Sequence, residues 1–253
     1  MSGKNPHIDF DFETVFEVDD YMYFYSEVLT DQRAETEVAA LVTLLGLDRP
    51  LKILDLACGF GRHTNRLAAL GHIMTGVDLT PGFLEIARRD AHQKHLSVNY
   101  QQADMRYITF KGEFDCVLLL FTAFGYFSDY ENLQVLKNIY DALIPGGRLI
   151  FDMHNRDVFL KTMYPFFVAE KEGNLMIDRM SFDSLNGRSI NKRIVIRDGV
   201  RKDKPFSIRL YNPNEISDLL VQAGLVLEHL YADWQGSEIS PESRRMVVIA
   251  HKP

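Results

Sequence analysis

The chain has 253 residues, of which 46% are hydrophobic and 25% charged, and its net charge is −7. This length is enough for one large α/β domain or for one domain with a substantial insertion. The negative charge does not favour a nucleic-acid partner, and two cysteines are too few for a disulfide framework. No apolar run reaches the roughly 18 residues that cross a bilayer, and residues 1–5 do not begin a signal peptide, so we expect a cytoplasmic protein without a membrane partner.

The first 30 residues combine acidic and aromatic side chains. Within residues 7–25, Asp and Glu are interspersed with Phe and Tyr. Such a segment is either a tail that docks a few rings on the body of the protein or a lid over a pocket, and we treat 1–30 as an N-terminal lid segment. Thr30 then caps a predicted helix over 31–45, whose apolar residues recur at helical spacing.

Strands and helices alternate from residue 51 to residue 153. We predict strands over 51–57, 73–79, 98–103, 114–121 and 148–153, and helices over 62–70, 81–95 and 130–144. Thr80 and Pro81 form a helix start, with threonine as the cap and proline at the first helical position. The Pro-Gly-Gly sequence at 145–147 ends the last of these helices. This order predicts βαβ units in a doubly wound parallel sheet.

The pattern changes after residue 160. Strand-like alternation runs through 166–210, with turns at 185–188 and 198–199. This alternation indicates a small antiparallel sheet inserted between the fifth and sixth strands of the main sheet.

The last part of the chain completes the main sheet. Asn212 and Glu215 start a helix over 212–223 as a variant of the capping box, and strands over 226–231 and 245–251 follow. We therefore divide the chain into the lid segment and three further parts, which are a core over 31–160, an inserted sheet on the substrate side over 161–211 and a C-terminal completion of the core over 212–253.

Three acidic residues fall at the C-terminal ends of successive predicted strands. Asp55 precedes a glycine turn, Asp78 ends the second strand and Asp104 ends the third. Doubly wound sheets bind their ligands outside these strand ends. Each aspartate alone has a local explanation, because aspartate favours turns and helix caps. Three of them at one edge of the sheet indicate a binding site.

The glycine turn does not fit a phosphate ligand. Gly59 and Gly61 are present, but Thr64 stands where a dinucleotide fingerprint has its third glycine, and no phosphate-binding lysine follows. Three carboxylates would also repel a pyrophosphate. They suit a ligand with hydroxyls, an amine and a positive charge, and S-adenosylmethionine (SAM) is such a ligand.

Each aspartate has a role in this hypothesis. Asp78 accepts hydrogen bonds from the two ribose hydroxyls. Asp104 accepts one from the adenine amino group, while the backbone of Met105 reads the edge of the ring. Asp55 holds the turn and helps to place the methionine ammonium. The sulfonium is attracted to aromatic faces.

These segments resemble the motifs of the class I SAM-dependent methyltransferases. The resemblance rests on residues 54–61, 77–79, 102–105, 114–121 and 144–149, in the order of the family. A narrower resemblance covers nearly the whole chain and is to a bacterial and archaeal group of the small-molecule type (methyltransferase-domain 25/11-like). The family implies a Rossmann-like, seven-stranded sheet whose last strand is antiparallel, with SAM as cofactor and S-adenosylhomocysteine as product.

The resemblance also implies further cofactor contacts. Besides the three aspartates, these fall on Ala57, Cys58, Gly59, Gly61, Leu79, Met105, Leu120 and Phe121. In related enzymes an N-terminal tyrosine and an arginine contact the methionine part of the cofactor, and Tyr25 and Arg33 lie in the matching region. We expect no metal, because the histidines show no ligand spacing.

The methyl acceptor is expected between the loops after strands four and five, the inserted sheet and the N-terminal segment. Candidate walls are Phe124, Tyr126, Phe127, Tyr211 and Trp234, although each ring suits a core equally well. His154 is the candidate base, because it follows strand five and its usual pKa suits proton removal near neutral pH. Tyr21 and Tyr23 are rival candidates, and a histidine that is merely hydrogen-bonded in a loop is the alternative.

The sequence therefore predicts methyl transfer to an N or O nucleophile of a small molecule by in-line displacement. A methyltransferase acting on RNA or protein is an alternative, since the inserted segment is locally basic. The Asn/Asp-Pro-Pro-aromatic signature of adenine N-methylation is absent after strand four. A nucleotide-dependent oxidoreductase or epimerase, or a SAM-binding protein without catalysis, are further alternatives. A homodimer is left open.

Overall fold

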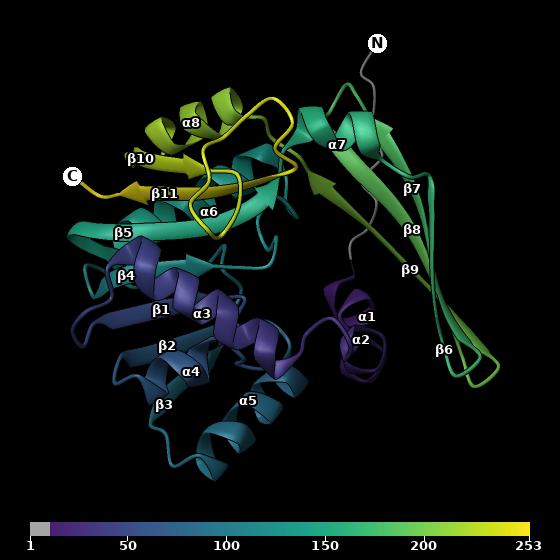
Figure 1. Ribbon diagram of the computed structural model, residues 1–253, viewed down its shortest axis with the longest axis horizontal. Coiled ribbons are helices and arrows are strands. Elements are labelled where there is room, and N and C mark those ends of the chain that lie inside the picture. Colours follow the sequence, from purple (N-terminus) through teal and green to yellow (C-terminus); the bar gives the residue numbers. More distant parts are fainter. Residues whose placement is uncertain (1–10) are drawn as a thin grey trace.

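The computed structural model describes residues 11–253, which form two sheets (Figure 1). The larger sheet has seven strands in the order β10-β11-β5-β4-β1-β2-β3. Strand β11 runs antiparallel to both of its neighbours, and the other pairs are parallel. Its strands are β1 (Lys52–Leu56), β2 (Ile73–Asp78), β3 (Val98–Gln102), β4 (Phe114–Leu119), β5 (Leu143–His154), β10 (Val226–Tyr231) and β11 (Arg245–His251). The predicted doubly wound sheet with an antiparallel last strand is confirmed.

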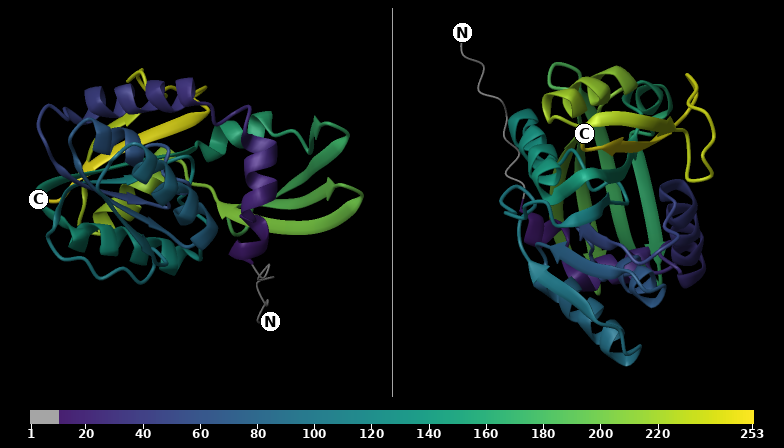
Figure 2. Two further views of the ribbon diagram at one scale, coloured as in Figure 1. Left: turned by 90° about the horizontal axis from the view of Figure 1, so that it is seen from below. Right: turned by 90° about the vertical axis from the view of Figure 1, so that its left-hand side faces the viewer.

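Helices cover both faces of this sheet (Figure 2). One layer holds α3 (Asp31–Leu45), α4 (Thr64–Ala69) and α5 (Pro81–Gln93), and the other holds α6 (Asp129–Ala142) and α8 (Pro213–Gln222). Successive strand residues face opposite layers, so Ile53 and Leu118 pack with α3 whereas Leu54 and Leu119 pack with α6. Burial on both faces explains why the sequence of β4 is almost continuously apolar.

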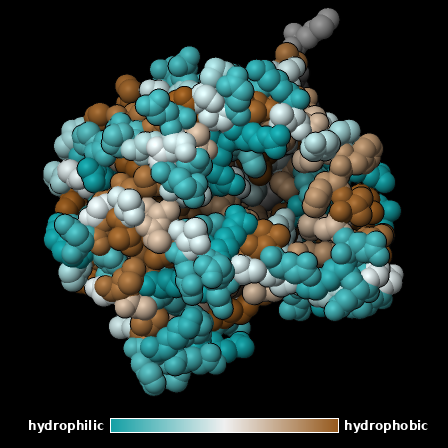
Figure 3. Space-filling model, viewed as in Figure 1, coloured by the Kyte–Doolittle hydropathy of each residue, from teal (hydrophilic) through white to brown (hydrophobic). Residues whose placement is uncertain are grey.

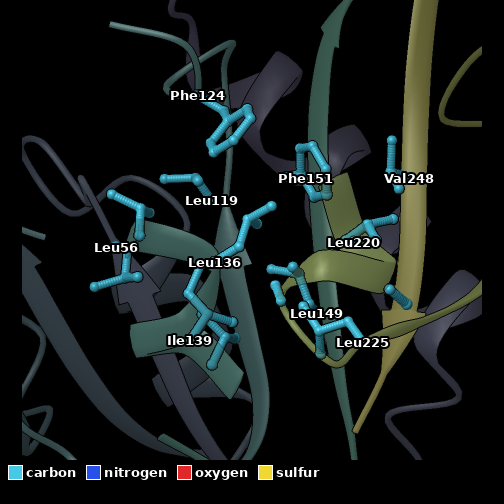
Figure 4. Close-up of a cluster of buried hydrophobic side chains, with 14 of the residues drawn as sticks. Leu56, Leu119, Phe124, Leu136, Ile139, Leu149, Phe151, Leu220, Leu225 and Val248 are labelled. Carbon is cyan, nitrogen blue, oxygen red and sulfur yellow. The ribbon is translucent and has the colours of Figure 1, made fainter. Parts of the chain in front are cut away.

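The larger part of the core lies between the sheet and the layer of α6 and α8. Figure 4 shows Leu136 and Ile139 of α6 and Leu220 of α8 in one cluster with Leu119 of β4. Phe124, from the loop after β4, belongs to the same cluster and is only 2% exposed. Each such side chain contributes about 1.5–3 kcal/mol on burial. The loop after β4 is therefore fixed to the core on one side.

The inserted region forms the second sheet. It consists of β6 (Phe166–Lys171), β7 (Asn174–Asp183), β8 (Arg188–Arg197) and β9 (Val200–Arg209), which pair antiparallel in chain order. The sheet follows β5 and the short helix α7 (Arg156–Thr162), and α8 comes after it. The predicted antiparallel insertion between the fifth and sixth core strands is confirmed.

The segment before α3 contains two helices that the sequence analysis did not predict. These are α1 (Phe12–Val15) and α2 (Val18–Tyr25). Asp11 caps α1, since its side chain accepts a hydrogen bond from the Thr14 N–H at 3.1 Å. Both helices lie beside the inserted sheet (Figures 1 and 2). Residues 1–10 of the predicted lid segment lie outside the described residues.

Some element ends differ from the prediction. Helix α4 begins at Thr64, α5 ends at Gln93, and α6 ends at Ala142. The Pro-Gly-Gly sequence at 145–147 therefore does not end a helix but lies in the irregular first part of β5. There Leu143 already pairs with β4, and the register shifts before the regular ladder begins. An irregular strand start tolerates proline because no ladder donor is needed.

Candidate active site

A cavity of about 360 Å³ lies at the C-terminal edge of the large sheet. Its lining comes from the ends of β1, β2 and β4, from α1 and α2, and from the inserted strands β7, β8 and β9. The space-filling view shows the surface hollowed between the core and the inserted sheet (Figure 3). The parts expected to surround a cofactor and an acceptor therefore meet at one cavity.

The glycine turn after β1 forms one end of this cavity. Its backbone is left-handed at Ala57 (φ 54°), Gly59 (φ 55°) and Gly61 (φ 78°). A Cβ on Gly59 would meet nothing within 4 Å, whereas one on Gly61 would lie 2.4 Å from Tyr100 Oη. Gly59 therefore leaves open space at the cavity. Gly61 is not among the lining residues, and glycine is needed there because the turn packs against β3.

Asp78 organises the same turn. Its Oδ2 accepts a hydrogen bond from the Gly59 N–H at 2.8 Å, and its Oδ1 accepts one from the Thr80 N–H at 2.8 Å. Burial raises the pKa of Asp78, and these backbone hydrogen bonds oppose the rise. Each carboxylate oxygen can still accept a further hydrogen bond. Asp78 thus ties the turn after β1 to the start of α5 and borders the cavity.

Asp55 and Asp104 line the cavity with Asp78. Asp55 is 2% exposed and accepts a hydrogen bond from Thr64 Oγ1 at 2.5 Å. Burial raises the pKa of Asp55 to about 7, against the opposing effect of the Thr64 hydroxyl. A positive charge bound nearby would favour its ionised form. Asp104 is held by a bidentate contact with Arg106, whose Nη2 lies 2.7 Å from Oδ2.

Arg62, just after the glycine turn, is a site residue that the sequence analysis missed. It is 8% exposed, pairs with Glu37 of α3 and lies 5.2 Å from the centre of the Phe121 ring. Its Nη2 is buried and has no hydrogen-bond partner within the part of the chain that the structure describes. A cation next to the N-terminus of α4 opposes the helix dipole, which was the available signal that Arg62 serves another purpose.

His63 lies beside Arg62 and contacts the same glutamate. Its Nε2 is 2.8 Å from Glu37 Oε2. Burial lowers the pKa of His63 to about 4, although the hydrogen bond to Glu37 opposes this effect. His63 is therefore neutral at physiological pH. The negative charge of Glu37 is compensated by Arg33 and Arg62.

The loop after β4 has an unusual backbone at the cavity. Phe121 (φ 62°) and Thr122 (φ 56°) are both left-handed. Asp152 of β5, which is fully buried, holds them, since its Oδ1 accepts from the Phe121 N–H at 2.6 Å and from the Thr122 N–H at 3.4 Å. Its Oδ2 pairs with Arg245 of β11. Left-handed residues other than glycine are uncommon and cluster at functional sites.

Aromatic side chains form a second wall. Tyr21 and Tyr25 of α2 stack with ring centres 4.6 Å apart, and Tyr21 meets Phe83 edge-on at 5.1 Å. Tyr126 and Phe127, from the loop after β4, also line the cavity. Burial raises the pKa of Tyr21 and of Tyr126, so both phenols are neutral at physiological pH.

The inner face of the inserted sheet forms a third wall. Its side chains are Met180 of β7, Ser189, Asn191 and Arg193 of β8, and Phe206 and Ile208 of β9. In the first half of β8, alternate residues from Ser189 to Arg193 line the cavity, as the period of a strand requires. None of these positions was predicted from the sequence to line the cavity. Asn191 gave a signal, because asparagine is depleted in strands.

His154 borders the cavity at the end of β5. The residue is exposed to solvent, although many protein atoms lie around its imidazole. This burial and the positive charge of Arg245 lower the pKa of His154 to about 4. The prediction of His154 as a base rests on the usual pKa of histidine, and the pKa in the structure is lower. The imidazole is neutral throughout the physiological range and accepts protons weakly.

Several predicted site residues are not among the side chains that line the cavity. Phe124 and Tyr211 are 2% and 3% exposed and pack against one another in the core. Trp234 packs against the apolar layer that contains α3. We leave these three rings out of the proposed acceptor site.

Tyr23 and Arg33 also lie off the cavity lining. Tyr23 points to the inserted sheet, where its Oη donates to the Lys171 carbonyl at 2.8 Å. Arg33 Nε lies 2.9 Å from Glu37 Oε1, so Arg33 supports the glutamate that pairs with Arg62. Neither residue is retained as a direct contact.

Over residues 11–253, no helix has the length and apolar character needed to cross a membrane. In the same residues, no three His, Cys, Asp or Glu side chains are grouped so as to hold a metal ion. Cys58 lines the cavity as a buried free thiol, and burial raises its pKa well above the usual value.

The chain is a doubly wound α/β protein, a class that binds ligands outside the carboxyl ends of its strands. A glycine turn and three carboxylates lie at that edge of the sheet. Residues 53–147 match the family model described as "Methyltransferase domain". The chain is 28% identical over 218 residues to "Putative methyltransferase YqeM" of Bacillus subtilis (strain 168), covering 79% of this chain and 84% of that one.

A second relative is the ubiquinone biosynthesis O-methyltransferase of Coxiella burnetii (strain Dugway 5J108-111). It is 31% identical over 124 residues, which cover 49% of this chain and 52% of the relative, so the match spans about half of that protein.

Two solved structures share the fold. The CcbJ methyltransferase of Streptomyces caelestis superposes with a TM-score of 0.78 at 20% identity, covering 92% of this chain and 96% of that one. SAM-bound CalS10, an amino pentose methyltransferase of Micromonospora echinaspora, gives 0.67 at 18% identity, covering 92% and 97%. The chain therefore carries a methyltransferase domain over residues 53–147 and shares the fold of these methyltransferase structures over most of its length.

Proposed function

We propose that the enzyme transfers a methyl group from SAM to an N or O nucleophile of a small molecule bound in the cavity. The observation that carries this proposal is the division of the cavity into two ends. Carboxylates and the glycine turn of the core line one end. Aromatic, apolar and polar side chains of α2 and the inserted sheet line the other, and the charge of Arg193 among them is paired with Asp178. A cavity of about 360 Å³ is in the size range of small-molecule sites.

The residues at the first end fit SAM. Arg62 Nη2 lacks a partner and suits the methionine carboxylate, while Asp55 suits the ammonium. Asp78 is proposed to accept from the ribose hydroxyls and Asp104 from the adenine amino group. The open space at Gly59 leaves room for the amino-acid part. Further contacts are proposed for lining residues of the same motifs, namely Ala57, Cys58, Leu79, Met105, Leu120 and Phe121.

The chain's task in catalysis is mainly to position the reactants. When bound, SAM supplies a methyl group that its sulfonium already activates. Holding a nucleophile in line with that carbon can supply roughly 7–11 kcal/mol of the barrier. The rings of Tyr21, Tyr25 and Tyr126 exclude water and offer faces that attract positive charge. Neutral His154 is proposed to orient the acceptor by accepting a hydrogen bond from it.

A small acceptor is favoured over RNA by the charges of the inserted sheet. Its basic side chains are largely paired within the chain: Arg193 with Asp178, Arg201 with Asp203, and Lys204 with Asp20. This pairing leaves little free positive charge for phosphates. The similar proteins include an O-methyltransferase and a sugar N-methyltransferase, so both N and O acceptors stay within the proposal.

We also propose that residues 1–30 act as a lid and that the protein is cytoplasmic. Side chains of α1 and α2 line the cavity, so their displacement would open it. Both cysteines are buried free thiols, which suits a reducing compartment.

Calorimetry with SAM, S-adenosylhomocysteine and NAD tests the cofactor end. We expect binding of the first two and none of NAD, and tight NAD binding without a SAM signal would overturn the proposal. Incubation with methyl-labelled SAM and a metabolite extract, followed by mass spectrometry, then identifies the acceptor by its gain of one labelled methyl group. Label found only in RNA or protein would contradict a small acceptor.

A further inference from the structure

Asn191 is a lining residue of the cavity, and its amide oxygen is buried without a hydrogen-bond partner in residues 11–253. It lies in the middle of β8, in register with Met180 of β7 and Phe206 of β9. The residue is 5% exposed.

This arrangement is unfavourable for the protein alone. A buried carbonyl oxygen has given up hydrogen bonds to water and gains none in return. Buried polar groups are nearly always paired, so each exception needs an explanation. Asparagine is also disfavoured in strands, and the neighbouring lining side chains of Met180, Phe206 and Ile208 are apolar. A hydrogen-bond donor on a bound ligand would satisfy the oxygen and would explain why asparagine stands at this position.

The nearest charged group on the same face does not serve as that partner. Arg193 lies two residues further along β8, and its Nε and Nη2 each lie 2.7 Å from an oxygen of Asp178. In this bidentate pair both oxygens of Asp178 accept hydrogen bonds from Arg193, and the two charges compensate one another. The wall therefore offers a hydrogen-bond acceptor without a free positive charge.

We propose that Asn191 Oδ1 accepts a hydrogen bond from an N–H or O–H group of the methyl acceptor. The contact selects a neutral molecule that carries a donor and an apolar body, in preference to a carboxylate or a phosphate. The apolar body packs against Met180, Phe206 and Ile208. This inference rests on the proposed function, because it takes this end of the cavity as the acceptor site.

The test uses four probes with the same ring and different head groups. Benzyl alcohol and aniline are neutral donors at pH 7.5, and benzoate and phenyl phosphate are anions. Their dissociation constants are measured by ligand-observed NMR on the full-length protein saturated with S-adenosylhomocysteine. We expect the neutral probes to bind more tightly than the anions. Asn191→Leu should weaken the neutral probes about five- to tenfold, the effect of one lost hydrogen bond.

Two further variants sharpen the comparison. Asn191→Asp keeps an oxygen acceptor and should hold the affinity for benzyl alcohol within about threefold. Lys192→Leu places a leucine at the neighbouring, exposed position of β8 and should leave the constants of the neutral probes unchanged. If Asn191→Leu does not fold, Asn191→Ala gives the same comparison without added volume.

The outcomes separate this inference from the proposed function. Unchanged affinity of the neutral probes in Asn191→Leu, tighter binding of either anion, or no binding of any probe would overturn the role of Asn191. S-adenosylhomocysteine should bind all variants equally, because its proposed contacts lie at the other end of the cavity. Failure of the wild-type protein to bind S-adenosylhomocysteine would contradict the proposed function itself.

Discussion

Asp20 of α2 and Lys204 of β9 form a buried ion pair that fastens the N-terminal helices to the inserted sheet. Lys204 Nζ lies 2.7 Å from Asp20 Oδ2, and the two side chains are 1% and 4% exposed. Lys202 and Arg197 also reach Asp20. Burial acts to raise the pKa of Asp20, but the hydrogen bonds from Lys204 and Lys202 prevail and lower it to about 2. The two walls of the acceptor end are therefore joined directly.

Replacement of Lys204 by methionine should destabilise this junction. Removing one partner of a buried ion pair leaves the other charge without full compensation, which costs about 3 kcal/mol or more. We expect that loss in the free energy of unfolding measured with denaturant, together with faster proteolysis of the segment before α3. Arg201→Met is the matched control on the same strand, because the Arg201–Asp203 pair is exposed. Arg201→Met should change the free energy of unfolding by less than about 0.5 kcal/mol. Equal effects of the two substitutions would show that the Asp20–Lys204 pair adds no particular stability.

The two glycines of the turn after β1 should respond differently to alanine. In Gly61→Ala the new methyl would overlap Tyr100 and also Ala87, and left-handed backbone plus overpacking costs about 3 kcal/mol. Gly59→Ala meets no atom of the chain within 4 Å and should cost only about 1 kcal/mol.

The same pair separates folding from binding. Gly59→Ala should remain folded yet bind S-adenosylhomocysteine at least about tenfold more weakly, because the methyl occupies space at the cavity. Thermal unfolding measures the stability of both variants, and calorimetry measures their affinity for S-adenosylhomocysteine. A Gly59→Ala protein with wild-type affinity would show that the cofactor does not approach this turn.

The core sheet could be predicted from the sequence because its signals come from residues that are close together in the chain. The central strands β1 and β4 are largely apolar on both faces. Thr80 with Pro81 and Asn212 with Glu215 mark helix starts within a few residues. Helix α2 was missed for the opposite reason. Its buried Asp20 is explained by lysines of β9, about 180 positions later in the chain.

Part of the candidate site could also be predicted from local sequence signals. Asp55, Asp78 and Asp104 follow from the order of parallel strands. The roles of Arg62 and Asn191 depend on which of their atoms lack a partner, and this is a property of the packed structure. The lowered pKa of His154 likewise comes from the protein around it and from Arg245, neither of which the spacing of residues records.

Replacement of Arg62 should weaken the binding only of ligands that carry the amino-acid part of the cofactor. Its unpartnered Nη2 is proposed to bind the carboxylate, and a hydrogen bond between charged groups is worth about 1.5–3 kcal/mol. Arg62→Met should therefore weaken S-adenosylhomocysteine about 10- to 100-fold. 5′-Methylthioadenosine lacks the amino-acid part, so its affinity should not change. Calorimetry with both ligands is the measurement, and equal losses for the two would indicate a general disturbance of the site.

Asp55→Asn should make the free protein more stable at high pH. The pKa of Asp55 is raised from 3.8 to about 7, so folding favours the protonated carboxyl. The contribution of this group to stability is present below about pH 4 and is lost as the pH rises through 7. Asparagine cannot ionise, so the gain should reach the order of 4 kcal/mol at pH 8 and shrink towards pH 5. Unfolding curves of both proteins across this range test it, and a gain independent of pH would contradict the raised pKa.

The same substitution should remove a pH dependence of binding. The proposed ammonium contact needs the Asp55 carboxylate, so wild-type affinity for S-adenosylhomocysteine should rise from pH 6 to pH 8. Asp55→Asn should bind more weakly at pH 8 and show a flatter profile. A wild-type profile as flat as that of the variant would rule out the contact.

His154 should influence turnover without acting as the base near neutral pH. Its pKa of about 4 places its ionisation below the working range, so it should add no step near pH 6.5 to the profile of kcat. We expect His154→Ala to lower kcat about tenfold through loss of an orienting hydrogen bond, with SAM affinity unchanged. General base catalysis typically contributes about 10²–10⁴-fold. A loss of that size, together with the disappearance of a wild-type step near pH 6.5, would show that His154 removes the proton, and unchanged kcat would remove it from the mechanism.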